Sequence, residues 1–367
     1  MVPDVVTEFI RLVQIDSPSR NERALADYLR QRFQELGIML TEDTAGQNIN
    51  GTAGNLIGFL PGDAREPLLL CAHMDTVKSN QGIEVVTKDG KISSKNQEHI
   101  LGADDKVGIA AIIQFVQDLV RKKLPHPPLE LVFTVAEEIG ILGAKELSIT
   151  QLQSKAGYVL DSGGPIGTIV NQAPVHYEYT IKISGRAAHA GYAPEYGISA
   201  IQIGARIVTA LDLGRVDEYT TANIGRISGG EADNIVPEFA QLTGEVRSHS
   251  LARAQQYLEQ LRNTAVEVAR DYGGVAEVRI KESFPPIQLP VEAKVIQVAQ
   301  RAASKLGVEP QLVTSGGGSD ANILNGRGIS CANLGVGSYF EHTREEYIQT
   351  ADFVLLVEYL KVIAEEW

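Results

Sequence analysis

Cysteine is scarce in this sequence, and long apolar runs are missing. The two cysteines, Cys71 and Cys331, make neither a metal-binding pair of the C-x-x-C type nor a disulfide framework. Both lie in apolar surroundings, as expected of reduced, buried thiols in the cytosol. No run reaches 18 apolar residues, which argues against a membrane-spanning helix. We therefore expect a cytoplasmic protein with no membrane partner.

Positive charge is also in short supply. Lysine and arginine number 33 against 46 aspartates and glutamates, so the formal net charge is −13. A chain of this sign repels phosphate backbones, which argues against a nucleic acid partner. The acids form no long block, so they suit a solvated acidic surface, and some of them can be gathered to hold cations.

Strands and helices alternate at both ends of the chain, and the pattern changes between them. Apolar runs such as residues 67–77 suit strands buried on both faces of a sheet. From residue 173 the strands alternate polar and apolar residues, in the order strand, helix, two strands, helix, strand. We predict an α/β domain, residues 1–172 and 288–367, with a mixed, largely parallel sheet flanked by helices. A smaller α+β domain of ferredoxin-like type is inserted as residues 173–287.

A histidine and an aspartate follow the apolar run that ends in LLLCA. Residues at i and i+2 of a strand point to the same face, so His73 and Asp75 project together. Sites in open α/β sheets form at the carboxyl ends of the strands. A capping aspartate beside a buried core histidine would give the same pattern.

Two pairs of acids occupy comparable places. Asp104 and Asp105 open a predicted helix, where they can favour its positive end or offer a rigid seat for a metal ligand. Glu137 and Glu138 follow a buried strand, where unpartnered acids are costly. Since adjacent side chains point apart, one of these two can bind a metal while the other faces a water. A solvated turn is the alternative.

Asp161 and His342 complete the set of candidates. Asp161 ends another apolar run before a glycine turn, and the turn alone could explain it. His342 precedes a predicted helix, where a surface histidine is the alternative. Two histidines and several carboxylates are ligands suited to divalent metals such as zinc.

The order of these residues resembles the co-catalytic di-zinc metallopeptidase family of peptidase T, carboxypeptidase G and aminoacylase. The resemblance spans nearly the whole chain and includes the runs GRAAHAGYAPEYGISA, NIGRISGGEADNIVP and SGGGSDAN. These runs look closest to peptidase T-like proteins.

The resemblance implies two zinc ions per subunit, and cobalt or manganese could use the same ligands. The implied metal ligands are His73, Asp104, Glu138, Asp161 and His342. Asp104 would bridge the two ions, with His73 and Asp161 on one side. Glu137 would be the general base for a hydroxide that bridges the metals, and Asp75 would hold the tautomer of His73.

Further residues match family positions that face the substrate. The resemblance implies that His189 meets the charge on the carbonyl oxygen from the neighbouring subunit of a homodimer, so the inserted domain would be a dimerisation domain. Asn234 and Arg247 would contact the substrate, and Arg247 could clamp a carboxylate. Gly317 and Gly318 would offer backbone amides at close approach.

We therefore expect a zinc-dependent exopeptidase that hydrolyses short peptides, of the tripeptide aminopeptidase type. A related amidohydrolase, such as an N-acyl amino acid deacylase or a carboxypeptidase, would share the metal chemistry. An inactive metal-binding scaffold is the alternative without catalysis, and the general base at Glu137 argues against it.

Overall fold

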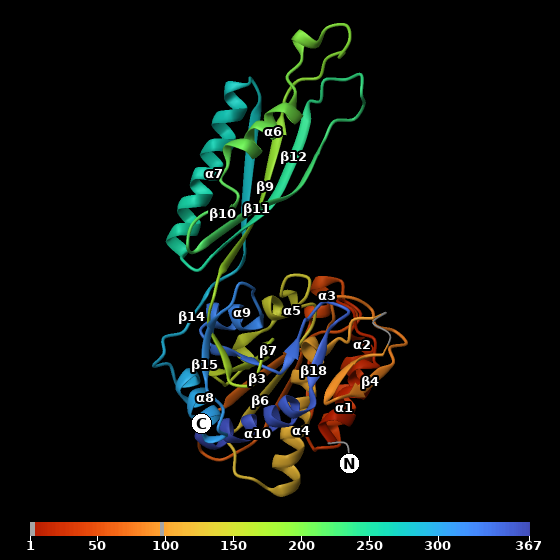
Figure 1. The fold of residues 1–367 in the computed structure, drawn as a ribbon, viewed down its shortest axis with the longest axis vertical. Helices are drawn as coiled ribbons and strands as arrows, with labels where there is room; N and C mark the ends of the chain where they lie inside the picture. Colours follow the sequence, from red (N-terminus) through yellow and green to blue (C-terminus); the bar gives the residue numbers. More distant parts are fainter. Residues whose placement is uncertain (1–3, 96–98) are drawn as a thin grey trace. The chain divides into compact units, whose positions relative to one another are not determined.

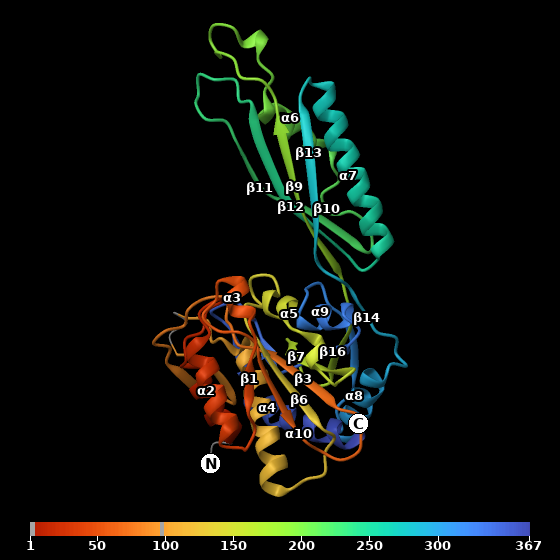
Figure 2. The same ribbon diagram turned by 180° about the vertical axis from the view of Figure 1, so that it is seen from behind.

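The computed structural model describes residues 4–95 and 99–367. These residues divide into two compact units. The first unit combines Met1–Gln172 with Ile287–Trp367, and the second is Ala173–Pro286. The first unit has a large and a small sheet, the second has one sheet, and each unit has its own helices (Figures 1 and 2).

The helices are α1 (Asp4–Val13), α2 (Arg23–Gln34), α3 (Ala45–Ile49), α4 (Ala103–Lys122), α5 (Leu142–Glu146), α6 (Ala200–Ala210), α7 (Leu251–Asp271), α8 (Lys294–Lys305), α9 (Asp320–Gly326) and α10 (Thr350–Glu366). The strands of the large sheet are β1 (Leu40–Glu42), β2 (Leu56–Leu60), β3 (Leu68–His73), β6 (Leu129–Thr134), β7 (Ala156–Ser162), β8 (Thr168–Ala173), β14 (Ile287–Gln288), β15 (Gln311–Thr314) and β16 (Ser330–Gly335). A smaller sheet holds β4 (Val85–Lys88), β5 (Lys91–Ser94), β17 (Ser338–Tyr339) and β18 (Tyr347–Gln349). The second unit has β9 (Val175–Ser184), β10 (Gly214–Arg215), β11 (Thr220–Gly229), β12 (Phe239–Ser248) and β13 (Val275–Phe284).

The large sheet has the strand order β1-β2-β6-β3-β7-β16-β8-β14, and β15 pairs with β8. Its centre is parallel, because β3 pairs in parallel with β6 and β7, and β16 with β7. Antiparallel pairs of β2 with β6 and of β16 with β8 make the sheet mixed. Every residue of β3 and β6 is buried, as expected of strands covered on both faces.

Helices α1, α4, α10 and α8 form one connected layer, in which each packs against the next and α4 contacts β3 and β7 (Figure 1). The layer forms because these helices carry apolar side chains at helical spacing, such as Val5, Phe9 and Leu12 of α1. Phe9 meets Phe353 of α10 edge-on, with ring centroids 5.5 Å apart. A second group, α3, α5 and α9, reaches β7 and β16 through α9.

The second unit has the element order β9-α6-β11-β12-α7-β13 and the antiparallel sheet order β10-β11-β12-β9-β13. Both helices lie on the same face of this sheet and pack against each other (Figures 1 and 2). The inward side chains of β9, among them Tyr179, Ile181 and Ile183, are buried against them, while Glu178 is exposed. The predicted fold class, with a mixed sheet in one part and a ferredoxin-like arrangement in the other, is confirmed.

No helix among residues 4–95 and 99–367 combines the length and apolar character that a membrane span requires.

Candidate metal centre

Three neighbouring strands bring four of the candidate residues to one edge of the large sheet. His73 is the last residue of β3, and Asp161 is the next-to-last residue of β7. Glu137 and Glu138 follow the end of β6. Because β3 lies between β6 and β7 and is parallel to both, the three carboxyl ends meet at the same edge.

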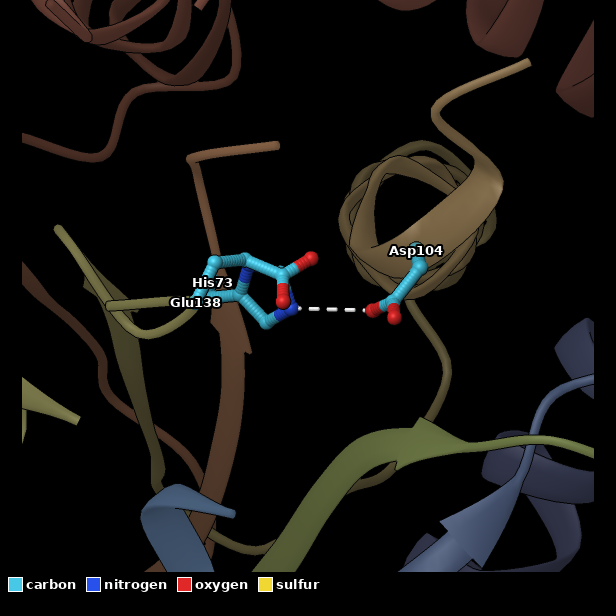
Figure 3. Close-up of side chains that lie close together, drawn as sticks. All are labelled: His73, Asp104 and Glu138. Carbon is cyan, nitrogen blue, oxygen red and sulfur yellow. Dashed lines mark hydrogen bonds and ion pairs between the residues drawn. The ribbon is translucent and has the colours of Figure 1, made fainter. Parts of the chain in front are cut away.

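Asp104 lies at the start of α4, and its two oxygens face different imidazoles. Its Oδ1 is 2.9 Å from Nε2 of His73, and its Oδ2 is 3.0 Å from Nε2 of His342. Figure 3 shows Asp104, His73 and Glu138 pointing toward one another from separate elements. A carboxylate in this position can bridge two cations.

Each imidazole has a second carboxylate beside it. Nε2 of His73 is 3.6 Å from Oδ1 of Asp161, and Nε2 of His342 is 3.1 Å from Oε2 of Glu138. The five predicted ligands therefore converge as two overlapping groups that share Asp104. His342 enters from the loop between β17 and β18, far away in the sequence.

Asp75 contacts several of the residues at the same edge of the sheet. Nδ1 of His73 lies 2.9 Å from the backbone carbonyl of Asp75 and 3.5 Å from its carboxylate. Two acceptors on Nδ1 favour a proton there, which leaves the Nε2 lone pair facing Asp104. The Asp75 carboxylate also accepts hydrogen bonds from the backbone N–H groups of Glu137 and Glu138 and from the hydroxyl of Ser19. It thereby fixes the turn that carries both glutamates.

The electrostatics of the cluster call for additional positive charge. Burial raises the pKa of the Asp161 carboxyl well above its ordinary value, and the neighbouring Asp104 raises it further. Burial likewise raises the pKa of Glu137, and Asp161 adds to the effect. Hydrogen bonds to Asp104 and Glu138 raise the pKa of His342 to about 10. Buried acids at this spacing repel one another unless protons or cations lie between them.

The donor set fits divalent metal ions. The ligand atoms of His73, Asp104 and Glu138 lie within 4.8 Å of one another. Oε1 of Glu138 is buried and has no hydrogen-bond partner in the part of the chain that the structure describes. Imidazole nitrogens and carboxylate oxygens are the ligands that zinc and related metals accept.

A second group of potential ligands, His73, Asp105 and Asp161, meets the same 4.8 Å limit. The Asp105 carboxylate, however, already accepts hydrogen bonds from the backbone N–H groups of His73 and Gly108. Asp104, whose oxygens face the imidazoles, is the better candidate for the shared ligand.

Comparison with known proteins identifies the family of this chain. The sequence profile of "Peptidase family M20/M25/M40" matches residues 69–366. The chain belongs to this peptidase family. The resemblance expected from the motifs is confirmed, and the protein is a hydrolase that acts as a peptidase.

Three relatives of this M20-family peptidase align over nearly their whole length. The aminopeptidase PepT from Bacillus cereus ATCC 10987 has 40% identity and a TM-score of 0.92, covering 99% of this chain and 97% of that one. A tripeptidase from Staphylococcus aureus subsp. aureus Mu50 has 37% identity and a TM-score of 0.93, covering 98% and 97%. The uncharacterized protein YqjE of Bacillus subtilis (strain 168) is 38% identical, covering 99% and 98%.

His189 and Asn234, two residues predicted to face the substrate, lie close together in the second unit. The backbone N–H of Ala190 donates to the carbonyl of Asn234, and His189 forms an isolated bridge with Ile235. The side chains of His189 and Asn234 are exposed. Both residues lie in loops beyond the end of β9.

Arg247 lies at the other end of the same sheet. It is opposite His176 in the pairing of β12 with β9, whereas Phe239 is opposite Ser184, near the loop of His189. The eight steps along the strand from residue 239 to residue 247 cover about 26 Å at roughly 3.3 Å per residue. The Arg247 guanidinium contacts Glu245, with Nη2 3.2 Å from Oε2.

Gly317 and Gly318 precede α9 in the first unit and are half-buried. A side chain added at Gly317 would meet only the Ser315 hydroxyl, at 3.8 Å, so its backbone borders open space. The loop is anchored by Asp320, which accepts hydrogen bonds from Thr134 of β6 and Cys71 of β3. His73 ends β3 and Glu137 follows the end of β6, so the loop is tied to the metal centre.

Asp320 and Glu346 are buried acids that sequence reasoning missed. Asp320 begins α9 and looks from sequence like an ordinary acid at a helix start. Glu346 accepts hydrogen bonds from three backbone N–H groups at the start of α4. The one sequence signal for Glu346 was that this acid comes four residues after His342, a predicted metal ligand.

Proposed function

We propose that this peptidase is a two-metal exopeptidase, with zinc as its metal, that removes residues from the amino end of short peptides, tripeptides above all. The observation that carries the proposal is Asp104, whose two oxygens face His73 and His342. The relatives named aminopeptidase PepT and tripeptidase support the substrate class.

Bound divalent cations supply Lewis-acid polarisation of the scissile carbonyl and lower the pKa of water. The residues of the chain provide the rest. Glu137 lies beside the ligands, and burial keeps the pKa of its carboxyl well above the ordinary value. A raised pKa brings a carboxylate closer to the working pH, which suits it to take a proton from water and pass it to the leaving amine.

We propose different roles for Glu137 and Glu138, and their surroundings support this. The backbone N–H groups of both residues donate to the Asp75 carboxylate, which holds the turn. Glu138 faces His342 at 3.1 Å, as a metal ligand should. Asp75 acts by holding His73 and this turn.

We propose that the chain works as a cytoplasmic homodimer, and that His189 serves the site of the neighbouring subunit. Nδ1 of His189 accepts hydrogen bonds from the N–H groups of Gly191 and Tyr192, at 3.2 and 3.1 Å. The neutral ring then carries its proton on Nε2, which can donate to a developing oxyanion.

The geometry of the second unit favours a shared site. A tripeptide spans about 10 Å when fully extended, whereas His189 and Arg247 lie at opposite ends of one sheet. One copy of this unit therefore cannot place both residues on the same tripeptide. Two copies can together place both residues on one tripeptide. Arg247 of one copy would then clamp a carboxylate of the peptide, and His189 and Asn234 would come from the other copy. Gly317 and Gly318 would line the substrate in the first unit.

A hydrolysis screen of the zinc-loaded protein tests the function. It compares tripeptides with free or blocked ends, dipeptides and N-acetyl amino acids. We expect release of the amino-terminal residue from free tripeptides, and loss of cleavage when the amino end is blocked. Cleavage of N-acetyl amino acids alone would replace the peptidase proposal by a deacylase. Loss of cleavage when only the carboxyl end of the peptide is blocked would indicate a carboxypeptidase.

Mixing two inactive variants tests the role of His189 in the neighbouring subunit. His189→Ala and Glu137→Ala homodimers should each be inactive. Heterodimers should regain activity at one of their two sites, up to about half of wild type per heterodimer, because that site has both residues intact. The measurement is tripeptide turnover after subunit exchange, confirmed by mass spectrometry of the mixed dimer. Confirmed heterodimers without activity would contradict the shared site.

A further inference from the structure

We propose that Glu346 is a positioning residue of the metal centre: it fixes the backbone of Asp104 and the loop that carries His342. Its loss should therefore weaken both cation sites through the shared Asp104, and should weaken the site of Glu138 and His342 further, because the His342 loop loses its anchor as well. The proposal rests on the two-metal function above and adds a residue that touches neither metal nor substrate.

The Glu346 side chain is buried and uses both of its oxygens. Oε2 accepts from the backbone N–H of Gly102 at 2.7 Å. Oε1 accepts from the N–H groups of Ala103 and Asp104 at 2.9 and 3.2 Å. With 1% of its surface exposed, the carboxylate has little access to water, so these contacts determine its position.

The segment that Glu346 binds has no regular helical support. Gly102 has a φ of +70°, and Asp104, with φ −76° and ψ 108°, lies outside the helical region. N–H groups at the start of a helix have no partner within the helix, and a buried one must find an acceptor. Glu346 is that acceptor, so it determines where the Asp104 carboxylate can point.

The same side chain anchors the loop of His342. The His342 side chain is 51% exposed, so burial does not hold it. Glu346 comes four residues later and directly precedes β18, which pairs with β5 and β17. It thus joins the loop to the start of α4, the element that carries Asp104.

The ligands on the other side have independent support. His73 ends β3 at the centre of the large sheet, and its backbone N–H donates to Asp105. Asp161 lies in β7, and its backbone N–H donates to the side chain of Asn333. These two contacts do not involve Glu346. The site of His73 and Asp161 should therefore be affected only through the shared Asp104, and should weaken less than the other site.

Glu346→Gln is the decisive variant, because an amide places an N–H group where one of the two oxygens now accepts. Zinc affinity at each site is measured by competition with a chromophoric chelator on the full-length protein. His342→Ala and Asp161→Asn give the reference profiles for loss of either site. Glu345→Gln, an exposed neighbour, is the matched control and should bind zinc like the wild type.

We expect Glu346→Gln to weaken the site of Glu138 and His342 by about 10- to 100-fold, with a profile like that of His342→Ala, and to weaken the site of His73 and Asp161 clearly less. Wild-type affinity at both sites would overturn the proposal, and so would equal weakening of both, which would indicate general destabilisation. If circular dichroism shows that Glu346→Gln is unfolded, Glu346→Asp is judged by the same criteria, and failure of that variant to fold also overturns a positioning role.

The wild-type titration separates this proposal from the function on which it rests. A wild-type protein with fewer than two zinc sites would refute the two-metal centre itself. Two wild-type sites that Glu346→Gln leaves unchanged would refute only the role of Glu346.

Discussion

Glu137→Gln should lower the turnover number for tripeptides by about 10²- to 10⁴-fold while two metal ions stay bound. Glutamine keeps the shape of the side chain but cannot accept the proton of the attacking water. Metal binding should persist, because the predicted ligands surround Asp104 and Glu137 is not one of them. The measurement combines steady-state kinetics with the zinc content per chain.

Glu138→Gln is the matched contrast, since the two residues are adjacent on one turn. Glu138 faces His342, so its variant should lose affinity for one metal and recover activity when zinc is raised. Glu137→Gln should show no such recovery. If Glu137→Gln loses zinc and Glu138→Gln keeps it, the two roles are exchanged.

Asp104→Ala should empty both metal sites and abolish activity. The reason is that its two oxygens face two different imidazoles, so a single substitution removes one ligand from each ion. Each ion would then keep only two predicted ligands, His73 with Asp161 or Glu138 with His342. Zinc content, measured by atomic emission after removal of loosely bound metal, should fall from two ions per chain to nearly none.

Asp271→Ala, at the exposed end of α7, is the control for the loss of a single aspartate and should retain both ions. An Asp104→Ala protein that is folded and still holds two ions would show that another residue bridges them. Asp105 would be the first candidate, because its carboxylate belongs to the second group around His73.

The convergence of the site was predictable from where its residues fall along the chain. His73, Glu137 and Asp161 each end or follow a continuous apolar run, and such runs become central parallel strands. The carboxyl ends of these strands share one edge, so the residues meet. The order β6-β3-β7 was not readable from the sequence, because strand order depends on long-range packing rather than on local pattern.

Residues that act through the backbone escaped prediction for a different reason. Glu346 accepts hydrogen bonds from backbone N–H groups more than 240 residues away in the sequence. Almost every residue type has such a group, so the sequence does not show which ones pair with Glu346. Asp320 likewise accepts hydrogen bonds from Thr134 and Cys71. Both side chains are uncharged, so the sequence gives no sign that they pair with an acid.

The second unit illustrates a further limit. Its element order follows from the alternating strands and two amphipathic helices, and its fold class was predicted on that basis. The separation of His189 from Arg247 along β9 and β12 depends on the strand register, which pairs Arg247 with His176. Register is set by tertiary packing and turn geometry, so sequence motifs alone placed the two residues in one site without revealing the distance between them.

Anomalous diffraction at the zinc edge, from crystals of the zinc-loaded protein, tests the two-metal centre most directly. We predict two peaks, one on either side of the Asp104 carboxylate, with His73 and Asp161 around the first and Glu138 and His342 around the second. A single peak, or zinc bound away from Asp104, would contradict the account.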